Sequence, residues 1–174
     1  MNYLFLDTET TGLITPFYVP YLVSISWAID NFPIETHIIK PDGWIVPLSS
    51  TRIHKISHNQ AMSEGEDLYD VLLMLREGMR KVKEIIIHNA NFDLTVLEEV
   101  CCDLFDGQTI VCTMLSTIEF CAIPRNGAYK YPKLSELYRK LFGKDFEGEL
   151  HSSSEDVKCL RECWKEMGKH FDLH

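Results

Sequence analysis

The sequence predicts an α/β fold in which a mixed sheet of five strands, three antiparallel and then two parallel, is flanked by helices. Two observations lead to this prediction. Three apolar segments separated by turn-forming residues occupy the first 40 residues, and after Pro47 segments with helical spacing alternate with short apolar strands. The chain has 174 residues, 45% of them hydrophobic and 25% charged, a composition typical of a globular protein with its own core. Because repeats and linkers are absent from the sequence, we expect residues 1–174 to form a single domain.

The first three strands are expected at residues 3–7, 21–30 and 34–40, which are rich in Val, Ile, Leu, Phe and Tyr. They are separated by short sequences typical of turns, namely Thr-Thr-Gly, Thr-Pro, Asp-Asn and Phe-Pro. The connections are short, and this favours antiparallel pairing of the three strands.

A helix and a parallel strand are expected next. Apolar residues recur at helical spacing over residues 68–82, and residues 84–88 then predict a buried strand. A strand that follows a crossover helix pairs in parallel with its neighbour. Residues 92–100 predict a further helix, and residues 109–113 a fifth short strand.

Two more helices complete the predicted fold. The spacing of apolar residues over 134–141 predicts a helix that ends at Gly143, since glycine readily adopts the conformation that terminates helices. The last helix is expected to begin at the Ser152–Glu155 cluster, which is rich in N-cap residues. Its inward face would carry Val157, Leu160 and Trp164.

The charge balance narrows the possible functions. With 26 acidic and 17 basic residues the net charge is −9, which argues against a protein that coats long stretches of duplex DNA. It does not argue against a nucleic-acid enzyme, because a site for divalent cations must itself be acidic and the bound cations invert the local charge. The six cysteines are scattered, so we expect reduced thiols rather than a disulfide scaffold or a zinc site.

The apolar segments are too short for a membrane protein. The N-terminal run from Tyr3 to Leu6 stops at Asp7, which is too short for the core of a signal peptide. No later segment approaches the ~20 apolar residues that span a bilayer. We therefore expect a soluble cytoplasmic protein without a membrane partner.

Two acids interrupt the first predicted strand. Side chains alternate between the faces of a strand, so Asp7 and Glu9 project from the same face, side by side. Two carboxylates held that close repel one another unless a cation lies between them. Gly12 follows and allows a tight turn.

Acids occur at two further places. Asp93 lies in the first turn of the helix that follows the buried strand, where the helix dipole alone would also favour an acid. His151 lies in a loop five residues before Asp156, which opens the last helix. Taken together, four carboxylates and one imidazole are the groups needed to hold two hard cations and to activate a water between them.

These segments resemble a known family. The similarity rests on three motifs: Asp7-Thr8-Glu9 with Thr-Thr-Gly-Leu after it, His88-Asn89-Ala90-x-Phe92-Asp93, and His151 followed at plus five by Asp156. They resemble the exonuclease motifs of the DnaQ-like, DEDDh-type 3′–5′ exonucleases, which include the proofreading subunit of bacterial DNA polymerase III. The resemblance covers residues 3 to about 167 and implies a ribonuclease H-like sheet.

The third motif departs from the family pattern at one position. The family usually carries Ala where this chain has Ser153, and we expect the added hydroxyl to lie near the edge of the metal site. Members that use a tyrosine as the base carry it four residues before the last Asp, where this chain has Ser152. The histidine subtype is therefore the better match.

The resemblance implies a role for each motif residue. Asp7, Glu9, Asp93 and Asp156 would bind two Mg²⁺ or Mn²⁺ ions, and His151 would take the proton from the attacking water. The backbone from Thr8 to Thr10 would meet the terminal sugar, Leu13 would wedge against the last bases, and Asn89 and Phe92 would flank the strand. For Leu13 and Phe92 the alternative is ordinary core packing. His54 and His88 are further residues that could approach the substrate.

A locally basic segment provides a candidate path for the strand. From Arg125 to Lys144 the chain has six basic residues and one acid, interleaved with three tyrosines. A basic groove with aromatic side chains is typical of proteins that track single strands, so Lys130 and Lys133 are candidates for guiding the substrate. The alternative is a solvated helix face.

The expected function is removal of nucleotides from the 3′ end of single-stranded DNA, in proofreading or repair, with a DNA polymerase as a candidate partner. The main alternative is a 3′–5′ exoribonuclease, because the sequence does not resolve the pocket that would accept or exclude a 2′-hydroxyl. A catalytically silent nucleic-acid-binding module is less favoured, because the four carboxylates and His151 are all present. A ribonuclease H-like endonuclease is also less favoured, because the motif of a histidine followed at plus five by an aspartate belongs to family members that act on strand ends.

Overall fold

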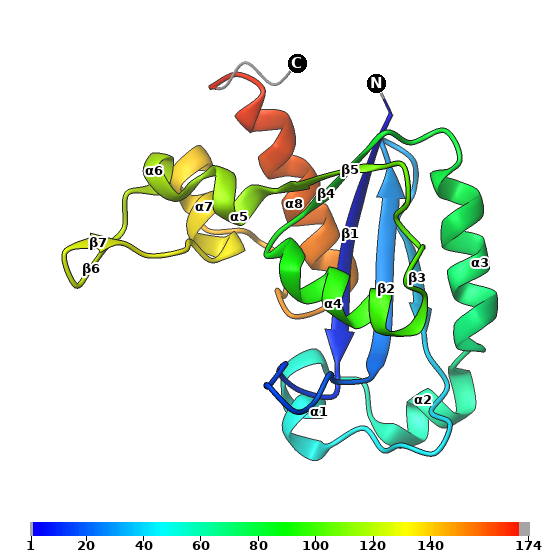
Figure 1. The fold of residues 1–174 in the computed structure, drawn as a ribbon. Coiled ribbons are helices and arrows are strands. Elements are labelled where there is room, and N and C mark those ends of the chain that lie inside the picture. The colour runs from blue at the N-terminus through cyan, green and yellow to red at the C-terminus, as the bar shows by residue number, and fades with distance from the viewer. Residues whose placement is uncertain (1, 171–174) are drawn as a thin grey trace.

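The computed structural model describes residues 2–170 of the chain. Within these residues a mixed five-stranded sheet has the order β3-β2-β1-β4-β5, with β1 at its centre (Figure 1). Neighbouring strands are antiparallel from β3 to β1 and parallel from β1 to β5, so the predicted α/β sheet is confirmed. The strands are β1 (Tyr3–Thr10), β2 (Leu22–Ile29), β3 (Glu35–Ile38), β4 (Glu84–Ile87) and β5 (Thr109–Cys112).

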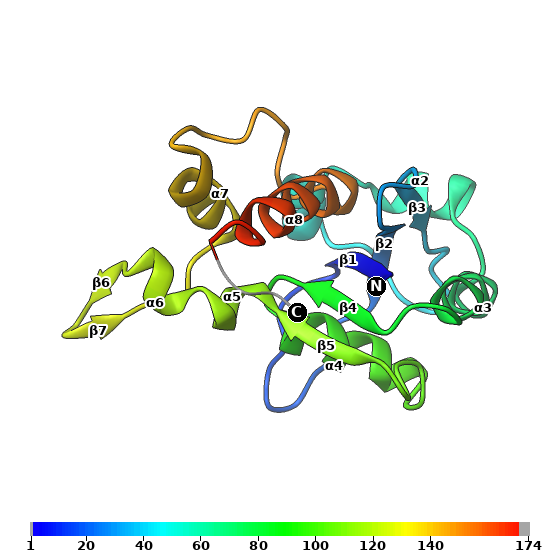
Figure 2. The same ribbon diagram turned by 90° about the horizontal axis from the view of Figure 1, so that it is seen from above.

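Helices cover both faces of this sheet, with α8 on one face and α4 on the other (Figure 2). No helix in the described part of the chain is long and apolar enough to cross a membrane. A short ribbon of β6 (Pro124–Arg125) and β7 (Ala128–Tyr129) stands apart from the main sheet. The helices are α1 (Leu48–His54), α2 (His58–Glu64), α3 (Leu68–Met79), α4 (Ala90–Val100), α5 (Thr113–Ser116), α6 (Ile118–Cys121), α7 (Leu134–Phe142) and α8 (Ser153–Met167).

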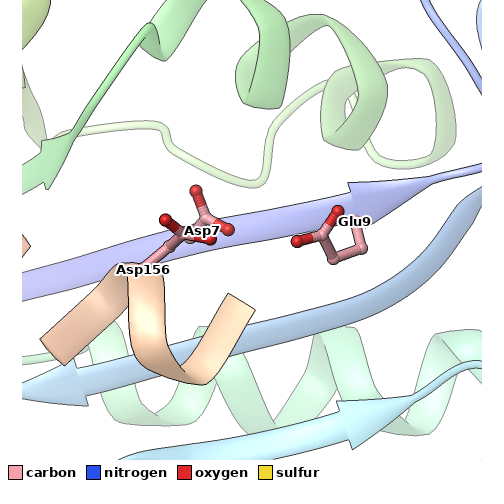
Figure 3. A group of neighbouring side chains, drawn as sticks. All are labelled: Asp7, Glu9 and Asp156. Carbon is pink, nitrogen blue, oxygen red and sulfur yellow. The ribbon is translucent and has the colours of Figure 1, made fainter. Parts of the chain in front are cut away.

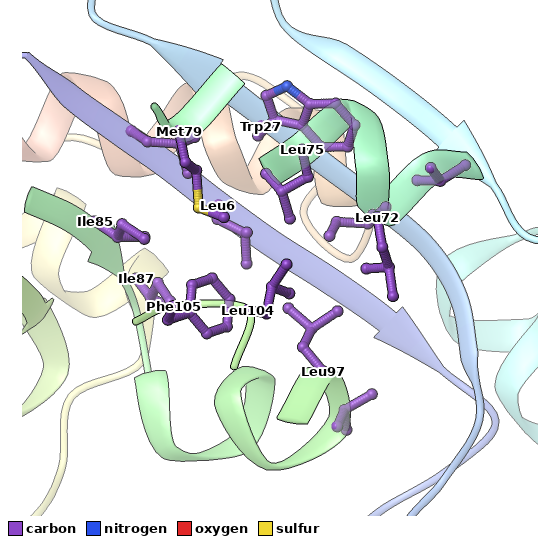
Figure 4. Packing of buried hydrophobic residues seen from close by; sticks show 14 of the residues in the cluster. Leu6, Trp27, Leu72, Leu75, Met79, Ile85, Ile87, Leu97, Leu104 and Phe105 are labelled. Carbon is purple, nitrogen blue, oxygen red and sulfur yellow. The ribbon is translucent and has the colours of Figure 1, made fainter. Parts of the chain in front are cut away.

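The alternation of side chains along β1 gives the sheet two hydrophobic cores. Leu4 and Leu6 are fully buried on the face covered by α3 and α4, where Leu75 and Leu97 meet them (Figure 4). Phe5 points to the opposite face, into the core formed with α7 and α8. Burial of both faces holds the start of β1 rigidly in the middle of the molecule.

β1 extends further than the predicted strand at residues 3–7. It pairs with β2 as far as Thr10, whereas its parallel pairing with β4 stops at Leu6, which lies opposite Ile87. The register with β2 shifts between Glu9 and Thr10. The second half of β1 therefore has a strand on one side only, and the start of α4 lies beyond the end of β4.

The last two helices follow the sequence prediction closely. α7 ends at Gly143, which adopts a left-handed conformation with φ of 69°, as expected for a helix C-terminus. α8 begins at Ser153, and its predicted inward residues Val157, Leu160 and Trp164 are all buried. Because α8 packs against the Phe5 face of β1, its first turn meets the middle of that strand.

Candidate active site

The carboxylates of Asp7 and Glu9 continue the row of side chains that Phe5 begins on the α8 face of β1. Asp156, in the first turn of α8, meets them on the same face of the sheet (Figure 3). The three residues each offer a ligand atom that lies within 4.8 Å of the others. Strand alternation places Asp7 and Glu9 side by side, and the packing of α8 adds Asp156 from the other end of the sequence.

Asp93 lies beside this group on a different element. α4 follows β4 through Asn89, which adopts a left-handed conformation with φ of 67°, and Asp93 falls in the first turn of the helix. Its side chain is 3% exposed and accepts a hydrogen bond from the Thr8 hydroxyl at 2.7 Å. Asp93 is therefore held by a neutral donor, close enough for its charge to act on Asp7 and Glu9.

The acids raise one another's pKa values. Burial, together with the charges of Asp156 and Asp93, holds the pKa of Asp7 well above its usual range and raises the pKa of Glu9 to about 8. Burial likewise raises the pKa of Asp93 to about 7, against the hydrogen bond from Thr8 that lowers it. The pKa of Asp156 rises to about 6, mainly through burial. Desolvated like charges disfavour the ionised form unless a cation compensates them.

The chemistry of this donor set fits a hard divalent cation. The three clustered side chains offer carboxylate oxygens, which are the ligands that Mg²⁺ and Mn²⁺ prefer. Burial and the neighbouring acids raise the pKa values of Asp7 and Glu9, and no basic side chain of the described residues offsets them. The site is thus suited to a positive charge supplied from outside the chain.

His151 is tied to Asp156 through its backbone. It has a left-handed conformation with φ of 76°, and its N–H donates to Asp156 Oδ2 at 2.8 Å. The loop before α8 turns sharply at this point, and the His151 side chain is exposed at the mouth of the site. The imidazole and the Asp156 carboxylate therefore lie at the same cleft.

A cleft of about 640 Å³ opens over the acids. The predicted substrate residues Thr8, Leu13, Asn89 and Phe92 all line it. Leu13 is 78% exposed, which excludes the core-packing alternative for this residue, whereas Phe92 lines the cleft and also packs against the first core. The side chain of Thr10 points elsewhere, since it is 8% exposed and donates to the Gly12 carbonyl at 2.7 Å.

His88 forms part of the cleft wall with both ring nitrogens engaged. Nε2 lies 3.0 Å from the Pro132 carbonyl and Nδ1 lies 2.9 Å from the Thr113 hydroxyl. A carbonyl only accepts, so Nε2 carries the proton and Nδ1 accepts from Thr113. Burial lowers the His88 pKa to about 4, which keeps the ring neutral. His54, in contrast, is 4% exposed, lies outside this cleft, and has a pKa that burial also lowers.

The two lysines predicted to guide the strand have different surroundings. Lys133 is exposed and lines the cleft. Lys130 does not line it, because its ammonium group forms an ion pair with Glu136, with Nζ to Oε distances of 2.6 and 2.8 Å. The sequence pattern could not separate them, since the pairing depends on how the chain turns into α7.

Ser153 lies against β2, beside Ser26 and Ser24, which pair with Asp7 and Glu9 of β1, and its nearness to a bound cation stays a prediction. Its side chain is 2% exposed and turns toward β2, where its hydroxyl lies 2.8 Å from Ser26 Oγ and 3.3 Å from Ser24 Oγ. Residues three apart share one face of a helix, so Ser153 and Asp156 both lie on the side of α8 that faces the sheet. Ser153 meets the sheet, and Asp156 meets the cleft.

Comparison with known proteins identifies the family. The family model for RNase_T exonucleases matches residues 4–162. The chain belongs to this exonuclease family. No curated protein matches the chain.

Solved structures share the fold of this exonuclease-family chain, which confirms the predicted ribonuclease H-like architecture. The nuclease domain of 3′hExo, described as a DEDDh family member bound to rAMP, has a TM-score of 0.77 at 16% identity, over 97% of this chain and 92% of that one. The zinc-bound E. coli ExoI–ssDNA complex has a TM-score of 0.75 at 17% identity, over 99% of this chain. The present chain spans only 41% of that exonuclease I chain.

The cleft of this protein also contains residues that the sequence pattern did not single out. Met114, Ser135 and Leu150 join the wall together with Tyr131 and Pro132. Tyr131 and Pro132 belong to the basic segment, but their place at the cleft depends on the contact between His88 and the Pro132 carbonyl. That contact joins residues 44 positions apart, for which a single sequence gives no signal.

Proposed function

We propose that the chain is a metal-dependent 3′–5′ exonuclease that removes nucleotides from the 3′ end of single-stranded DNA. The observation that carries the proposal is the group of Asp7, Glu9 and Asp156, with ligand atoms within 4.8 Å of one another at an open cleft. Membership of the exonuclease family supports the reaction class.

Asp7, Glu9 and Asp156 would hold divalent cations, with Asp93 completing a set for two Mg²⁺ or Mn²⁺ ions. Bound in pairs, such ions acidify the attacking water and stabilise the leaving oxygen. The rigid placement of Asp7 and Glu9 on a central strand supports this role, because the ligands are ordered before any cation arrives. Thr8 would orient the Asp93 carboxylate through its hydrogen bond.

His151 would act as the general base. Its imidazole is exposed at the cleft, and its backbone bond to Asp156 keeps it near the acids. Histidine is the side chain best suited to take a proton near neutral pH. The exposed position leaves the ring able to approach a water held among the carboxylates.

The cleft surface supports binding of a strand without regard to sequence. Leu13 and Phe92 offer apolar surface on which any base can stack, Asn89 offers an amide, and Lys133 offers a positive charge for phosphates. Thr8 to Thr10 would present backbone groups to the terminal sugar. An association with a DNA polymerase remains a prediction.

A second candidate substrate is RNA. It is favoured by the likeness to a structure described as 3′-end specific recognition of a histone mRNA stem-loop by a 3′-exonuclease, with a TM-score of 0.78 over 97% of this chain and 82% of that one. The identity is 16%, so the choice between the polymers has to be made by experiment.

The test uses 5′-labelled single-stranded DNA and RNA of one sequence, incubated with the protein in Mg²⁺, Mn²⁺ or EDTA. We expect a metal-dependent ladder that shortens from the 3′ end, and no ladder from the Asp156→Asn variant. The polymer that is degraded faster identifies the substrate. Intact substrate in every metal would contradict the proposal, and so would a variant as active as the wild type.

A further inference from the structure

The ribbon of β6 and β7 is a defined hairpin that projects from the body of the molecule (Figures 1 and 2). Pro124 pairs with Tyr129 and Arg125 pairs with Ala128, which leaves a loop of Asn126 and Gly127. Both loop residues have positive φ angles, of 50° and 81°. This is the two-residue turn that matches the twist of a hairpin, and Asn-Gly is its preferred sequence. The projection is therefore a regular β-hairpin whose strand register is set by its turn.

The base of this hairpin is anchored at the rim of the cleft. The Lys130 N–H donates to the Ile123 carbonyl at 3.0 Å, and the Lys130 ammonium group pairs with Glu136 at the start of α7. Two residues further on, the Pro132 carbonyl accepts a hydrogen bond from His88 Nε2. The segment between the hairpin and α7 is thus fixed at both ends, and Tyr131 lies on the cleft side of it.

The charge of the hairpin segment differs from that of the chain as a whole, and its exposed side chains include aromatic rings. Residues 124–133 carry three basic residues and no acid, although the net charge of the chain is −9. The Arg125 side chain is exposed and forms no ion pair with the described residues. Tyr129 is 47% exposed and Tyr131 is 61% exposed. Arg125 and Tyr129 line one surface hollow, which Glu119 of α6 also lines. A cation can bind phosphates and exposed aromatic rings can stack on bases.

We propose that Arg125, Tyr129 and Tyr131 form a second binding surface, for the nucleotides of a single strand that lie upstream of its 3′ end. The proposal rests on the proposed function, because it assigns a binding site to the portion of the strand that extends out of the cleft. Arg125 contacts phosphates, the two tyrosines stack on bases, and the anchored rim leads the strand from the hairpin to the acids. The hairpin then contributes to the affinity for long strands and not to hydrolysis of the terminal bond.

Two substrates of different length test this division. One is an oligonucleotide of about 20 nucleotides, longer than the ~4–16 nucleotides that a single-strand groove covers. The other is the p-nitrophenyl ester of thymidine 5′-monophosphate, which carries one nucleotide and reaches only the cleft. We expect the double variant Arg125→Ala/Tyr129→Ala to raise KM for the oligonucleotide about tenfold, since loss of a stacked base and a phosphate contact weakens binding to that extent. Hydrolysis of the ester should remain unchanged, which also shows that the variant is folded.

A matched control removes the same residue types from another part of the molecule. Tyr69 and Arg80 are exposed at the two ends of α3, on the side away from the hairpin (Figure 1). The Tyr69→Ala/Arg80→Ala variant should leave both KM values at the wild-type level. An equal KM for the oligonucleotide in the hairpin variant and this control would overturn the proposal. So would an equal loss on both substrates.

Direct binding separates this proposal from the proposed function. Fluorescence anisotropy with labelled single-stranded DNA and RNA in EDTA measures affinity without turnover. The hairpin variant should bind the long strand about tenfold more weakly, and its affinity should fall less steeply with salt because one phosphate contact is lost. Failure of the wild type to cleave either substrate would contradict the proposed function alone. Equal binding by wild type and hairpin variant would contradict the upstream surface alone.

Discussion

The hydroxyl of Ser26, within β2, lies 2.8 Å from the hydroxyl of Ser153, the first residue of α8. Ser26 is also 2.8 Å from the Thr36 hydroxyl in β3, and Ser24 is 3.3 Å from Ser153. Ser24, Ser26 and Ser153 are almost completely buried. Buried hydroxyls are costly unless they are hydrogen-bonded, so this chain of hydroxyls fixes where α8 begins relative to the sheet.

Replacement of Ser153 by alanine should therefore destabilise the protein. Ser153→Ala removes the side-chain partner of Ser24 and one of the partners of Ser26, and we expect the free energy of unfolding to fall by about 1–2 kcal/mol. Urea unfolding checks this. Ser63→Ala, which removes an exposed hydroxyl from α2, is the control and should change stability little. Equal stability of both variants would contradict a structural role for the Ser153 hydroxyl.

Replacement of a ligand acid should abolish turnover and weaken metal binding. Asp7→Asn removes a charge from the group formed with Glu9 and Asp156. Each bound cation is worth several kcal/mol of transition-state stabilisation, so the rate should fall roughly a thousandfold or more. Calorimetric titration with Mn²⁺ should show the loss of binding in parallel. A variant that binds metal normally would show that Asp7 is not a ligand.

The histidine variant should separate catalysis from metal binding. His151→Asn removes the imidazole, while asparagine tolerates the left-handed backbone and keeps the N–H that bonds Asp156. We expect turnover to fall by about 10²–10⁴-fold, the usual contribution of a general base. Mn²⁺ affinity should stay close to that of the wild type. Retention of full activity would remove His151 from the mechanism.

The metal-free protein should become less stable as the pH rises from about 6.5 to about 8.5. The pKa of Glu9 is raised to about 8 and that of Asp93 to about 7, so in this range the folded state binds more protons than the unfolded state. Stability falls with rising pH as long as the folded state holds these extra protons, and it levels off above about 8, where both groups are ionised in the folded and in the unfolded state. Below this range the lowered pKa of His88, about 4, acts in the opposite direction, because unfolding then lets the ring take up a proton.

Urea midpoints measured in EDTA and in excess Mg²⁺ check the pH effect. In EDTA the midpoint should decrease across the interval, and Glu9→Gln should flatten the decrease because the side chain no longer ionises. Mg²⁺ should raise the midpoint most at the alkaline end, where the acids are charged and bind it best. A midpoint in EDTA that rises with pH would contradict the raised pKa values of the acids.

Much of this molecule could be predicted from short-range patterns. The alternation of β1 places Asp7 and Glu9 on one face, and the spacing of α8 directs Val157 inward while Asp156 opens its first turn. Such features depend on residues close in sequence, and their periodicity is visible in a single chain. The metal, base and substrate roles, and the single domain over residues 1–174, remain predictions.

Features that depend on distant residues could not be predicted. The direction of the Ser153 hydroxyl is set by Ser26, 127 positions away, and the cleft rim by the contact between His88 and Pro132. The helices α1 and α2 were also not predicted, because each is seven residues long and lacks a sustained apolar period. The hairpin has an Asn-Gly signal at Asn126, but its strands are too short for an alternating pattern.

Because the pKa values of Glu9 and Asp93 are raised, binding of a cation exchanges it for protons held by these carboxyl groups. Near neutral pH these carboxyl groups are partly protonated, and ligands must lose their protons to bind a cation. Uptake of Mg²⁺ then releases protons to the solvent, and the apparent affinity for the ion rises as the pH increases. The folded chain thus couples the acidity of its surroundings to the fraction of molecules that carry a complete site.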